Sequence, residues 1–530
     1  MIQQWWHSAV VYQVWPRSFA DSNGDGVGDL RGLIGKLDHL SDLGVDVVWL
    51  SPVYPSPQVD NGYDISDYQD VDPLFGTLAD LDELIACLHA RGMRLVLDVV
   101  VNHTSDQHPW FVESRSSRTS PKRHWYFWYE QPPNDWASLF AGPAWQLDEA
   151  TGEYYLHTFA REQPDLRWEE PQVRAAVVDM LRWWLDRGVD GFRLDVISMI
   201  SKYLDKPEGI LGFGPDLHDH LHELHREVFA GRDLVTVGET PGTSVEQARL
   251  LTEPERRELD MVFEFEHVSL DRGVSKWDVV PLTLPTLKRC FQTWQDGIGS
   301  GWNSLYWDNH DQPRVVSRFG DDGEHRVASA STLATVLHLH RGTPFIYQGE
   351  ELGMADARFT SLSDYRDLES LNHYTEAVAR GQPPEQVLAA LQRTSRDNAR
   401  TPVQWDSSQH AGFTTGTPWI PVGSAAGTVN AAAQRNDPHS VLAHYRRLIR
   451  LRHEVPAVAY GDFTLLLPED ERVWAFTRRY EQVELLVVAN LSAQHVVPAM
   501  DGWQDGELLL GNLPEPGPVL RPWESRVLRR

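Results

Sequence analysis

Short apolar runs alternate with amphipathic segments along the first 350 residues of the chain. The runs are rich in Val, Ile, Leu and aromatic residues, which is typical of parallel strands buried on both faces. Helical patterns separate most of the runs: Thr77–Arg91 begins at an N-capping threonine, and Pro171–Arg187 has its proline in the first turn. This alternation predicts an α/β fold, a (β/α)8 TIM barrel. The eight predicted strands are Val11–Phe19, Val45–Val53, Arg94–Val101, Gly191–Ile197, Asp233–Gly238, Asp260–Glu266, Ser304–Asp308 and Pro344–Gln348.

The spacing of the predicted strands is uneven in two places. Thr104–Glu169, between the third and fourth strands, has no clear helical periodicity. Because a structureless loop of that length is uncommon in a compact domain, we expect a small inserted domain there. Gly349–Trp419 follows the eighth strand and contains a helical stretch near Pro384–Arg393. The chain then returns to the barrel through a helix near Val441–His453.

The last segment, Gly461–Arg530, has a different hydrophobic pattern from the barrel region. Its short alternating runs, separated by Pro and Gly, predict an antiparallel β domain. The runs are Phe463–Leu467, Arg472–Arg478 and Val483–Leu491. The predicted domains are therefore a barrel at 1–103 and 170–458, an inserted domain at 104–169 and a C-terminal β-sandwich at 459–530.

The charge balance narrows the expected partners. Asp and Glu number 76 against 48 Lys and Arg, a formal net charge of −28. Such a chain repels nucleic acid and anionic membranes, so we expect neither as a partner, whereas a neutral sugar is compatible with it. The chain has two cysteines, and it shows neither a basic N-terminal stretch followed by an apolar core nor a long apolar run. These features predict a cytoplasmic protein. The sequence leaves monomer and homodimer open.

Three acidic residues stand at the carboxyl ends of predicted strands, where (β/α)8 barrels build their active sites. They are Asp195, Glu239 and Asp311. Arg193 lies two residues before Asp195, so both face the barrel axis, and the cation favours an ionised Asp195. Two carboxyl groups are the minimum that glycoside hydrolysis requires.

Several motifs resemble a known family. Asp98–His103, Gly191–Asp195, Gly238–Glu239 and Asn309–Asp311 look like those of glycoside hydrolase family 13, the α-amylase family. Asp60–Tyr68, Gln163–Leu166 and Asn398–Trp405 look like its oligo-1,6-glucosidase and α-glucosidase branch.

The resemblance implies a retaining α-glucosidase that takes a terminal glucose from a small oligosaccharide or disaccharide. Asp195 matches the nucleophile, Glu239 the general acid/base and Asp311 the third acid of the family. Asp98 is expected to orient Arg193 by hydrogen bonding, without direct chemistry. The implied substrate-binding residues are Asp60, Tyr63, His103, Gln163, Arg193, Val196, His310 and Arg400.

Val196, directly after the expected nucleophile, bears on linkage. In this branch, valine at that position accompanies α-1,6 preference, and alanine or threonine accompanies α-1,4. Ordinary strand packing is the alternative explanation. An α-1,4 or sucrose-type α-glucosidase, or a transglucosylase or isomerase of the same family, also remains open.

A loop after the first strand has oxygen ligands at alternating positions with glycines between them, a pattern that suits Ca²⁺. Its candidate ligands are Asp21, Asn23, Asp25, the Val27 carbonyl and Asp29. The branch often carries a structural Ca²⁺ at this point, and we expect no cofactor for catalysis. A metal-free loop held by Asx-turns is the alternative.

Overall fold

The computed structural model describes residues 3–498 and 502–530. Residues 1–2 and 499–501, which the predicted barrel and C-terminal domains include, lie outside the described residues. Eight parallel strands form one sheet in the order β10-β11-β1-β2-β3-β7-β8-β9. An isolated parallel bridge between Val262 and Asn303 joins the two ends of this order, so the sheet closes. The predicted (β/α)8 barrel is confirmed. Its strands are β1 (Val11–Val14), β2 (Val47–Leu50), β3 (Arg94–Val100), β7 (Gly191–Asp195), β8 (Val235–Glu239), β9 (Met261–Phe263), β10 (Ser304–Leu305) and β11 (Thr343–Tyr347).

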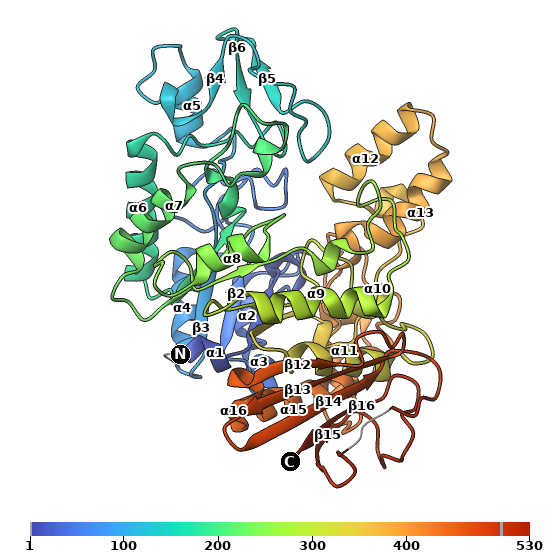
Figure 1. Cartoon of the computed structure of the whole chain (residues 1–530). Coiled ribbons are helices and arrows are strands. Elements are labelled where there is room, and N and C mark those ends of the chain that lie inside the picture. The colour runs from blue at the N-terminus through green and yellow to red at the C-terminus, as the bar shows by residue number, and fades with distance from the viewer. Residues whose placement is uncertain (1–2, 499–501) are drawn as a thin grey trace.

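Helices cover the outside of the barrel (Figure 1). The predicted helix at Thr77 is α4, and Thr77 caps it by accepting from the Asp80 backbone N–H while Asp80 reaches back in a capping box. Pro171 occupies the first turn of α6, and Gly188 follows its end with φ +103°. The larger barrel helices are α4 (Leu78–His89), α6 (Pro171–Asp186), α7 (Leu217–Leu224), α8 (Val245–Thr252), α9 (Leu284–Gly297), α11 (Arg326–His338) and α15 (Val441–Glu454).

Most of the barrel strands are shorter than the apolar runs that predict them, and β1 and β7 show the physical reason. β1 ends at Val14 because Pro16 begins a 3₁₀ turn, Pro16–Ser18, and proline has no N–H for a strand ladder. β7 ends at Asp195 because Val196 adopts a left-handed conformation with φ +35°. Apolar composition continues through both breaks, so hydrophobic pattern alone places the strand ends too late.

The inserted segment carries its own small sheet, in the order β4-β6-β5. A separate cluster of buried side chains, including Phe127, Trp136 and Trp145, packs beneath it. This sheet and the C-terminal sheet lie at opposite ends of the molecule (Figure 1). The cluster also includes Ile210 from the segment after β7, so the inserted segment packs against the barrel as well as on itself, and the limits 104 and 169 stay a prediction. The elements are α5 (Pro109–Arg115), β4 (Trp128–Tyr129), β5 (Trp145–Asp148) and β6 (Glu153–Leu156).

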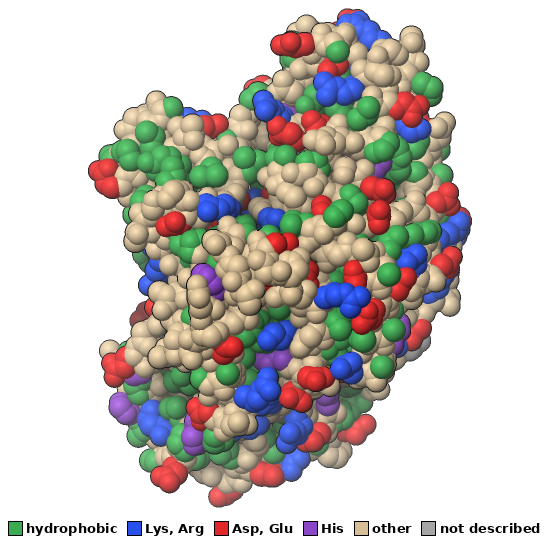
Figure 2. All heavy atoms as spheres, turned by 180° about the vertical axis from the view of Figure 1, so that it is seen from behind, with side chains coloured by type: hydrophobic (Ala, Val, Ile, Leu, Met, Phe, Trp, Pro, Cys, Tyr) green, Lys and Arg blue, Asp and Glu red, His purple; other side chains and the backbone are tan. Residues whose placement is uncertain are grey.

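The segment after β11 forms a second projection. Helices α12 (Leu368–Ala379) and α13 (Pro384–Thr394) lie in it, and α13 is the helix predicted near Pro384. Seen from behind, the surface is hollowed between this projection and the inserted segment (Figure 2). A cavity between the two projections is lined by Asp195 and Glu239, which end β7 and β8, by Phe140 of the inserted segment and by Glu369 of α12.

The C-terminal segment forms a five-stranded antiparallel sheet in the order β12-β13-β14-β16-β15. Among the described residues, an isolated bridge between Val496 and Leu520 is the one further pairing in this segment. Lys288 of α9 donates to the carbonyl oxygens of Leu467, Asp470 and Val473, which fastens the sheet to the barrel. An antiparallel β domain is confirmed, whereas the sandwich and its limits stay predictions. The strands are β12 (Asp462–Leu466), β13 (Val473–Tyr480), β14 (Val483–Asn490), β15 (Glu507–Gly511) and β16 (Ser525–Arg529).

Within residues 3–498 and 502–530, no helix combines the length and the apolar character needed to cross a membrane.

Candidate active site

The three acids picked from the sequence line one cavity. Asp195 ends β7 and Glu239 ends β8, while Asp311 lies in the segment after β10. The cavity has a volume of about 310 Å³, which is within the range of small-ligand pockets. Asp60, Tyr63, His103, Asp195, Val196, Glu239 and Asp311 line it, together with Phe140, Phe159, Phe265 and other residues. Of the other predicted substrate-binding residues, Gln163, Arg193, His310 and Arg400 lie behind this first layer and hold it in place.

Arg193 joins the two central acids. Its guanidinium donates to Asp195 Oδ1 at 2.6 Å through Nη1 and contacts Glu239 Oε2 at 2.8 Å through Nη2. Nη1 also donates to Asp98 Oδ1 at 2.9 Å, so the expected contact of Asp98 with Arg193 is present. The Arg193 side chain is 1% exposed, so these contacts are shielded from water and from salt.

The proton balance of this cluster follows from burial and charge. Burial raises the pKa of Asp195, and the nearby carboxylates of Glu239 and Asp98 raise it further, while Arg193 opposes both effects. Burial likewise raises the pKa of Asp98 to about 6. One guanidinium therefore faces three carboxyl groups, and the cluster keeps a proton to a higher pH than an exposed carboxyl group does.

The carboxyl group of Asp311 lies among basic side chains rather than among other carboxyl groups. Burial alone would raise its pKa, but His310, Arg396 and Arg400 lower that pKa well below the ordinary value. Arg400 Nη2 donates to Asp311 Oδ1 at 2.7 Å, and Arg396 Nη1 donates to the same oxygen at 3.2 Å. Asp311 is therefore a fixed negative charge, whereas the raised pKa values of Asp195 and Asp98 place the proton of the cluster on the carboxyl groups beside Arg193.

A hydrogen-bonded group closes the far wall of the cavity. Gln163 Nε2 donates to Asp60 Oδ2 at 3.2 Å and to the Tyr63 carbonyl oxygen at 3.3 Å. His103 Nε2 lies 3.1 Å from the same carbonyl oxygen. Gln163 comes from the inserted segment and the others from the ends of β2 and β3, so three separate segments build this wall.

Both predicted histidines are neutral hydrogen-bonding groups. Burial lowers the pKa of His103 to about 4 and that of His310 to about 3. The His310 ring stacks on Trp15 and Tyr63, with ring centroids 5.0 and 5.2 Å away. Neutral imidazoles suit the binding of uncharged hydroxyl groups.

Val196 sits on the cavity wall in a strained backbone. Its φ of +35° is rare for a β-branched residue. Its backbone N–H donates to Glu239 Oε2 at 3.1 Å, so the turn after Asp195 also positions Glu239.

Sequence reasoning missed four charged residues that line this cavity, Arg272, Lys276, Glu369 and Arg396, and Asp367, which pairs with Arg396 behind it. Arg396 Nη2 contacts Asp60 Oδ1 at 3.2 Å, and Nε donates to Asp367 at 2.9 Å. Lys276 pairs with Glu369, and both line the cavity. These residues follow β9 and β11 at a distance in the chain, so no strand end marks them. A signal was available at Arg396, because this charged residue lies four positions before Arg400 in the same segment.

The candidate calcium loop lies outside this cavity. The Asp21 carboxylate accepts backbone N–H groups from Asn23, Gly24 and Gly26, and Asn23 and Asp25 each accept one from two residues on. Asp29 caps helix α2 (Leu30–Ile34) through the Gly32 N–H. These are the Asx-turns of the metal-free alternative, and they leave oxygen lone pairs on Asn23 and Asp25. In the described part of the chain, no three His, Cys, Asp or Glu side chains converge as a metal site.

Comparison with known proteins agrees with this geometry. Residues 13–461 match the family model "Alpha amylase, catalytic domain". An oligo-1,6-glucosidase of Parageobacillus thermoglucosidasius is 51% identical, over 100% of this chain and 99% of that protein. A trehalulose synthase variant superposes with a TM-score of 0.97 at 44% identity, over 100% of both chains. A trehalose-6-phosphate hydrolase variant of Bacillus licheniformis gives 0.95 at 43% identity, over 99% of this chain and 100% of that one.

The match spans the barrel from β1 to the first residues of the C-terminal segment, and the relatives cover the full length. The chain belongs to the α-amylase family of glycoside hydrolases.

Proposed function

We propose that the protein is an exo-acting, retaining α-glucosidase that releases glucose from the non-reducing end of short α-glucosides and favours α-1,6 linkages. The observation that carries the proposal is the pairing of Asp195 and Glu239 on the single guanidinium of Arg193 at one wall of a pocket. The similarity to an oligo-1,6-glucosidase over the whole chain supports the substrate class.

The chemistry assigned to these residues has two steps. Asp195 attacks the anomeric carbon, the glycosidic C–O bond breaks, and Glu239 gives its proton to the departing oxygen. Water then transfers a proton to Glu239 while its oxygen attacks the same carbon and expels Asp195. Asp311, held as an anion by Arg396 and Arg400, accepts sugar hydroxyl groups and stabilises the positive charge that develops on the ring.

Retention of configuration is supported by how closely the two acids lie. Retaining enzymes place their carboxyl groups about 5–5.5 Å apart, whereas inverting enzymes leave about 6.5–9.5 Å for a water molecule. Here one guanidinium contacts both, and Glu239 also accepts the N–H of Val196, the residue next to Asp195. These contacts favour the shorter separation.

Exo action and linkage preference rest on the cavity walls. Asp60 is joined to Gln163 by a hydrogen bond and to Arg396 by an ion pair, and the proposal takes this connected wall as the end of the cavity that admits only a terminal sugar. Val196 lies beside the nucleophile on the wall of the pocket, where its two methyl groups limit how the leaving group approaches.

Incubation with isomaltose, maltose, sucrose and trehalose in turn, followed from the first minutes by proton NMR, tests the proposal. Early α-glucose, fastest from isomaltose, is the expected result. Early β-glucose would contradict retention, and faster release from maltose or sucrose would contradict the linkage preference.

A disaccharide isomerase is the second candidate, because a trehalulose synthase variant superposes on the whole chain. In that case the released sugar would attack the glucosyl intermediate in place of water. The same NMR series separates the two functions, since an isomerase forms a new disaccharide without free glucose.

We also propose a structural Ca²⁺ in the loop of Asp21, Asn23, Asp25, Val27 and Asp29. The oxygen-only donor set and the lone pairs left on Asn23 and Asp25 support it. Chelation with EDTA is expected to lower the melting temperature, and added Ca²⁺ to restore it. An unchanged melting temperature would favour the loop held by Asx-turns alone.

The location proposed is the cytoplasm, which the free thiols of Cys87 and Cys290 support. Fractionation of the source cells tests it. The monomer or homodimer expected from the sequence stays a prediction for light scattering.

A further inference from the structure

A second cavity opens beside the active-site pocket and has an unusual charge for this protein. Its volume is about 320 Å³, roughly ten times the 30 Å³ that one water occupies in the liquid. Five of the residues that line it are cationic and two are acidic, although the chain as a whole carries a net charge of −28. The cations are Arg272, Lys276, Arg318, Arg358 and Arg393, and the acids are Asp271 and Asp356.

Three of the five cations already have acidic partners. Arg318 Nε donates to Asp271 at 2.8 Å, Arg358 pairs with Asp322 at 2.6 Å, and Lys276 pairs with Glu369. These pairs fix the walls of the cavity and contribute little net charge to it.

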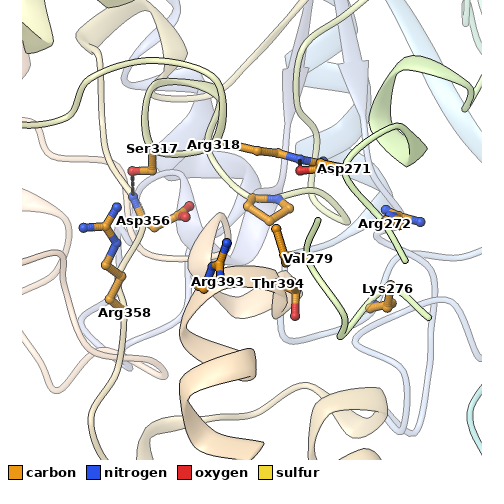
Figure 3. Close-up of a pocket in the computed structure, with 11 residues that line it drawn as sticks. Asp271, Arg272, Lys276, Val279, Ser317, Arg318, Asp356, Arg358, Arg393 and Thr394 are labelled. Carbon is orange, nitrogen blue, oxygen red and sulfur yellow. Dashed lines mark hydrogen bonds and ion pairs between the residues drawn. The ribbon is translucent and has the colours of Figure 1, made fainter. Parts of the chain in front are cut away.

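The other two cations have no acidic partner among the described residues. Arg272 donates to the amide oxygen of Gln312 at 2.8 Å and makes no ion pair. Arg393 is exposed near the end of α13 and has neither a hydrogen bond nor an ion pair in the described part of the chain. Figure 3 shows its guanidinium extended toward the middle of the lining residues. Two guanidinium groups thus face the cavity with no acid in ion-pair contact among the described residues, although Asp271 and Glu369 lie near enough to act on Arg272.

The acid on the opposite wall weakens this positive field little. Burial raises the pKa of Asp356 to about 7, and its carboxylate accepts the backbone N–H of Arg314 at 2.7 Å. Asp356 is therefore partly protonated near neutral pH and repels an incoming anion less than an exposed aspartate would.

We infer that this cavity binds a phosphate group, carried either by inorganic phosphate or by a phosphorylated sugar. Two guanidinium groups match the charge of a phosphate, and their planar forks donate paired hydrogen bonds to its oxygens. Arg272 and Lys276 line both this cavity and the active-site pocket, so a sugar phosphate can lie across the two. The inference is independent of the proposed function, because binding is measured without turnover.

Calorimetric titration with inorganic phosphate, glucose 6-phosphate and glucose, at one fixed ionic strength, tests it. Arg393→Gln removes an unpaired cavity cation without touching the active-site pocket. Arg450→Gln is the matched control, since Arg450 is also exposed on a helix, α15, makes no hydrogen bond or ion pair within the described residues and lines neither cavity. Arg393→Ala, which removes the same charge and suits a helix, is the second cavity variant if Arg393→Gln melts at a lower temperature.

We expect a phosphate probe to bind wild type and Arg450→Gln equally, and Arg393→Gln about tenfold or more weakly, the effect of one charge-assisted hydrogen bond. Tighter binding of glucose 6-phosphate than of phosphate, with the same loss in Arg393→Gln, would identify a sugar phosphate as the ligand. Binding of inorganic phosphate that is as tight or tighter would identify the free anion. No saturable binding of either phosphate probe, or equal weakening in Arg393→Gln and Arg450→Gln, would overturn the inference.

Discussion

Replacement of Arg193 by lysine separates its charge from its geometry. The guanidinium contacts Asp195 at 2.6 Å, Glu239 at 2.8 Å and Asp98 at 2.9 Å, from a side chain that is 1% exposed. A lysine ammonium keeps the positive charge but has one nitrogen, so it cannot span the two reacting carboxyl groups at these distances. We therefore expect a folded protein whose acids are misplaced.

The size of the effect follows from the contacts that are lost. A hydrogen bond to a charged group contributes about 1.5–3 kcal/mol, and each 1.4 kcal/mol is a factor of ten. Loss of the contacts to both Asp195 and Glu239 lowers kcat/KM about 10²- to 10⁴-fold, with most of the loss in kcat. Arg193 lowers the pKa of Asp195, so without the fork this pKa rises and the acidic limb of the pH–rate profile moves to higher pH.

The assay is steady-state kinetics on isomaltose from acidic to alkaline pH, with thermal melting to verify folding. Arg94→Lys is the matched control, because Arg94 pairs with Asp233 on the same sheet, outside the cavity. Its kcat/KM is expected to stay at the wild-type value. A folded Arg193→Lys protein with near-wild-type kcat/KM and an unmoved pH profile would refute the reasoning.

Three further substitutions test the neighbouring residues. Glu239→Gln removes the proton donor and is expected to lower kcat on isomaltose about 10²- to 10⁴-fold, with less loss on an aryl glucoside that needs no protonation; equal losses on both substrates would count against the assignment. Asp60→Asn tests linkage between protonation and stability: burial raises the pKa of Asp60 from 3.8 to about 7 in the folded protein. Protonation of Asp60 therefore stabilises the folded protein fully below about pH 4, and this stabilisation is lost as the pH rises through about 7. The free energy of unfolding in urea is expected to be up to about 4 kcal/mol higher for the variant than for wild type at pH 8, and much less so at pH 5. The KM of the variant is expected to rise. A gain that does not depend on pH would contradict this reasoning. Val196→Thr is expected to lower the ratio of kcat/KM on isomaltose to that on maltose about 10- to 200-fold, and an unchanged ratio would leave Val196 a packing residue.

The barrel was predictable from the sequence because its strands are buried on both faces and their helices carry clear caps. Thr77 and Pro171 mark helix starts that the structure reproduces within a residue. Strand ends were less predictable, since Pro16 and the left-handed Val196 interrupt runs that remain apolar. Local backbone geometry decided both ends.

The inserted segment shows a different limit. Helix α5 (Pro109–Arg115) has only seven residues, too few for a helical repeat to show in a region crowded with Trp and polar residues. The core beneath β4–β6 is built from aromatic residues spread over the segment, such as Phe127 and Trp145. Because these contacts join residues far apart in the chain, they produce no regular spacing of apolar residues in the sequence.

The residues of the site likewise divide into those that strand position predicts and those that only the tertiary fold brings together. Asp195, Glu239 and Arg193 were found because strand position and spacing fix where their side chains point. Arg396 and its partner Asp367 were missed because they lie in the long segment after β11, and only folding brings Arg396 into the cavity lining, within 3.2 Å of Asp60. The cationic cavity at Arg393 depends on the same segment.

Trapping of the covalent intermediate decides whether Asp195 is the nucleophile. Incubation with 5-fluoro-α-glucosyl fluoride slows the second step, and peptide mass spectrometry then locates the attached sugar. The account predicts one fluoroglucosyl group on Asp195, with loss of activity in step with labelling and none in Asp195→Asn. A label on Glu239 or Asp311, or an unlabelled enzyme that still releases α-glucose from isomaltose, would contradict it.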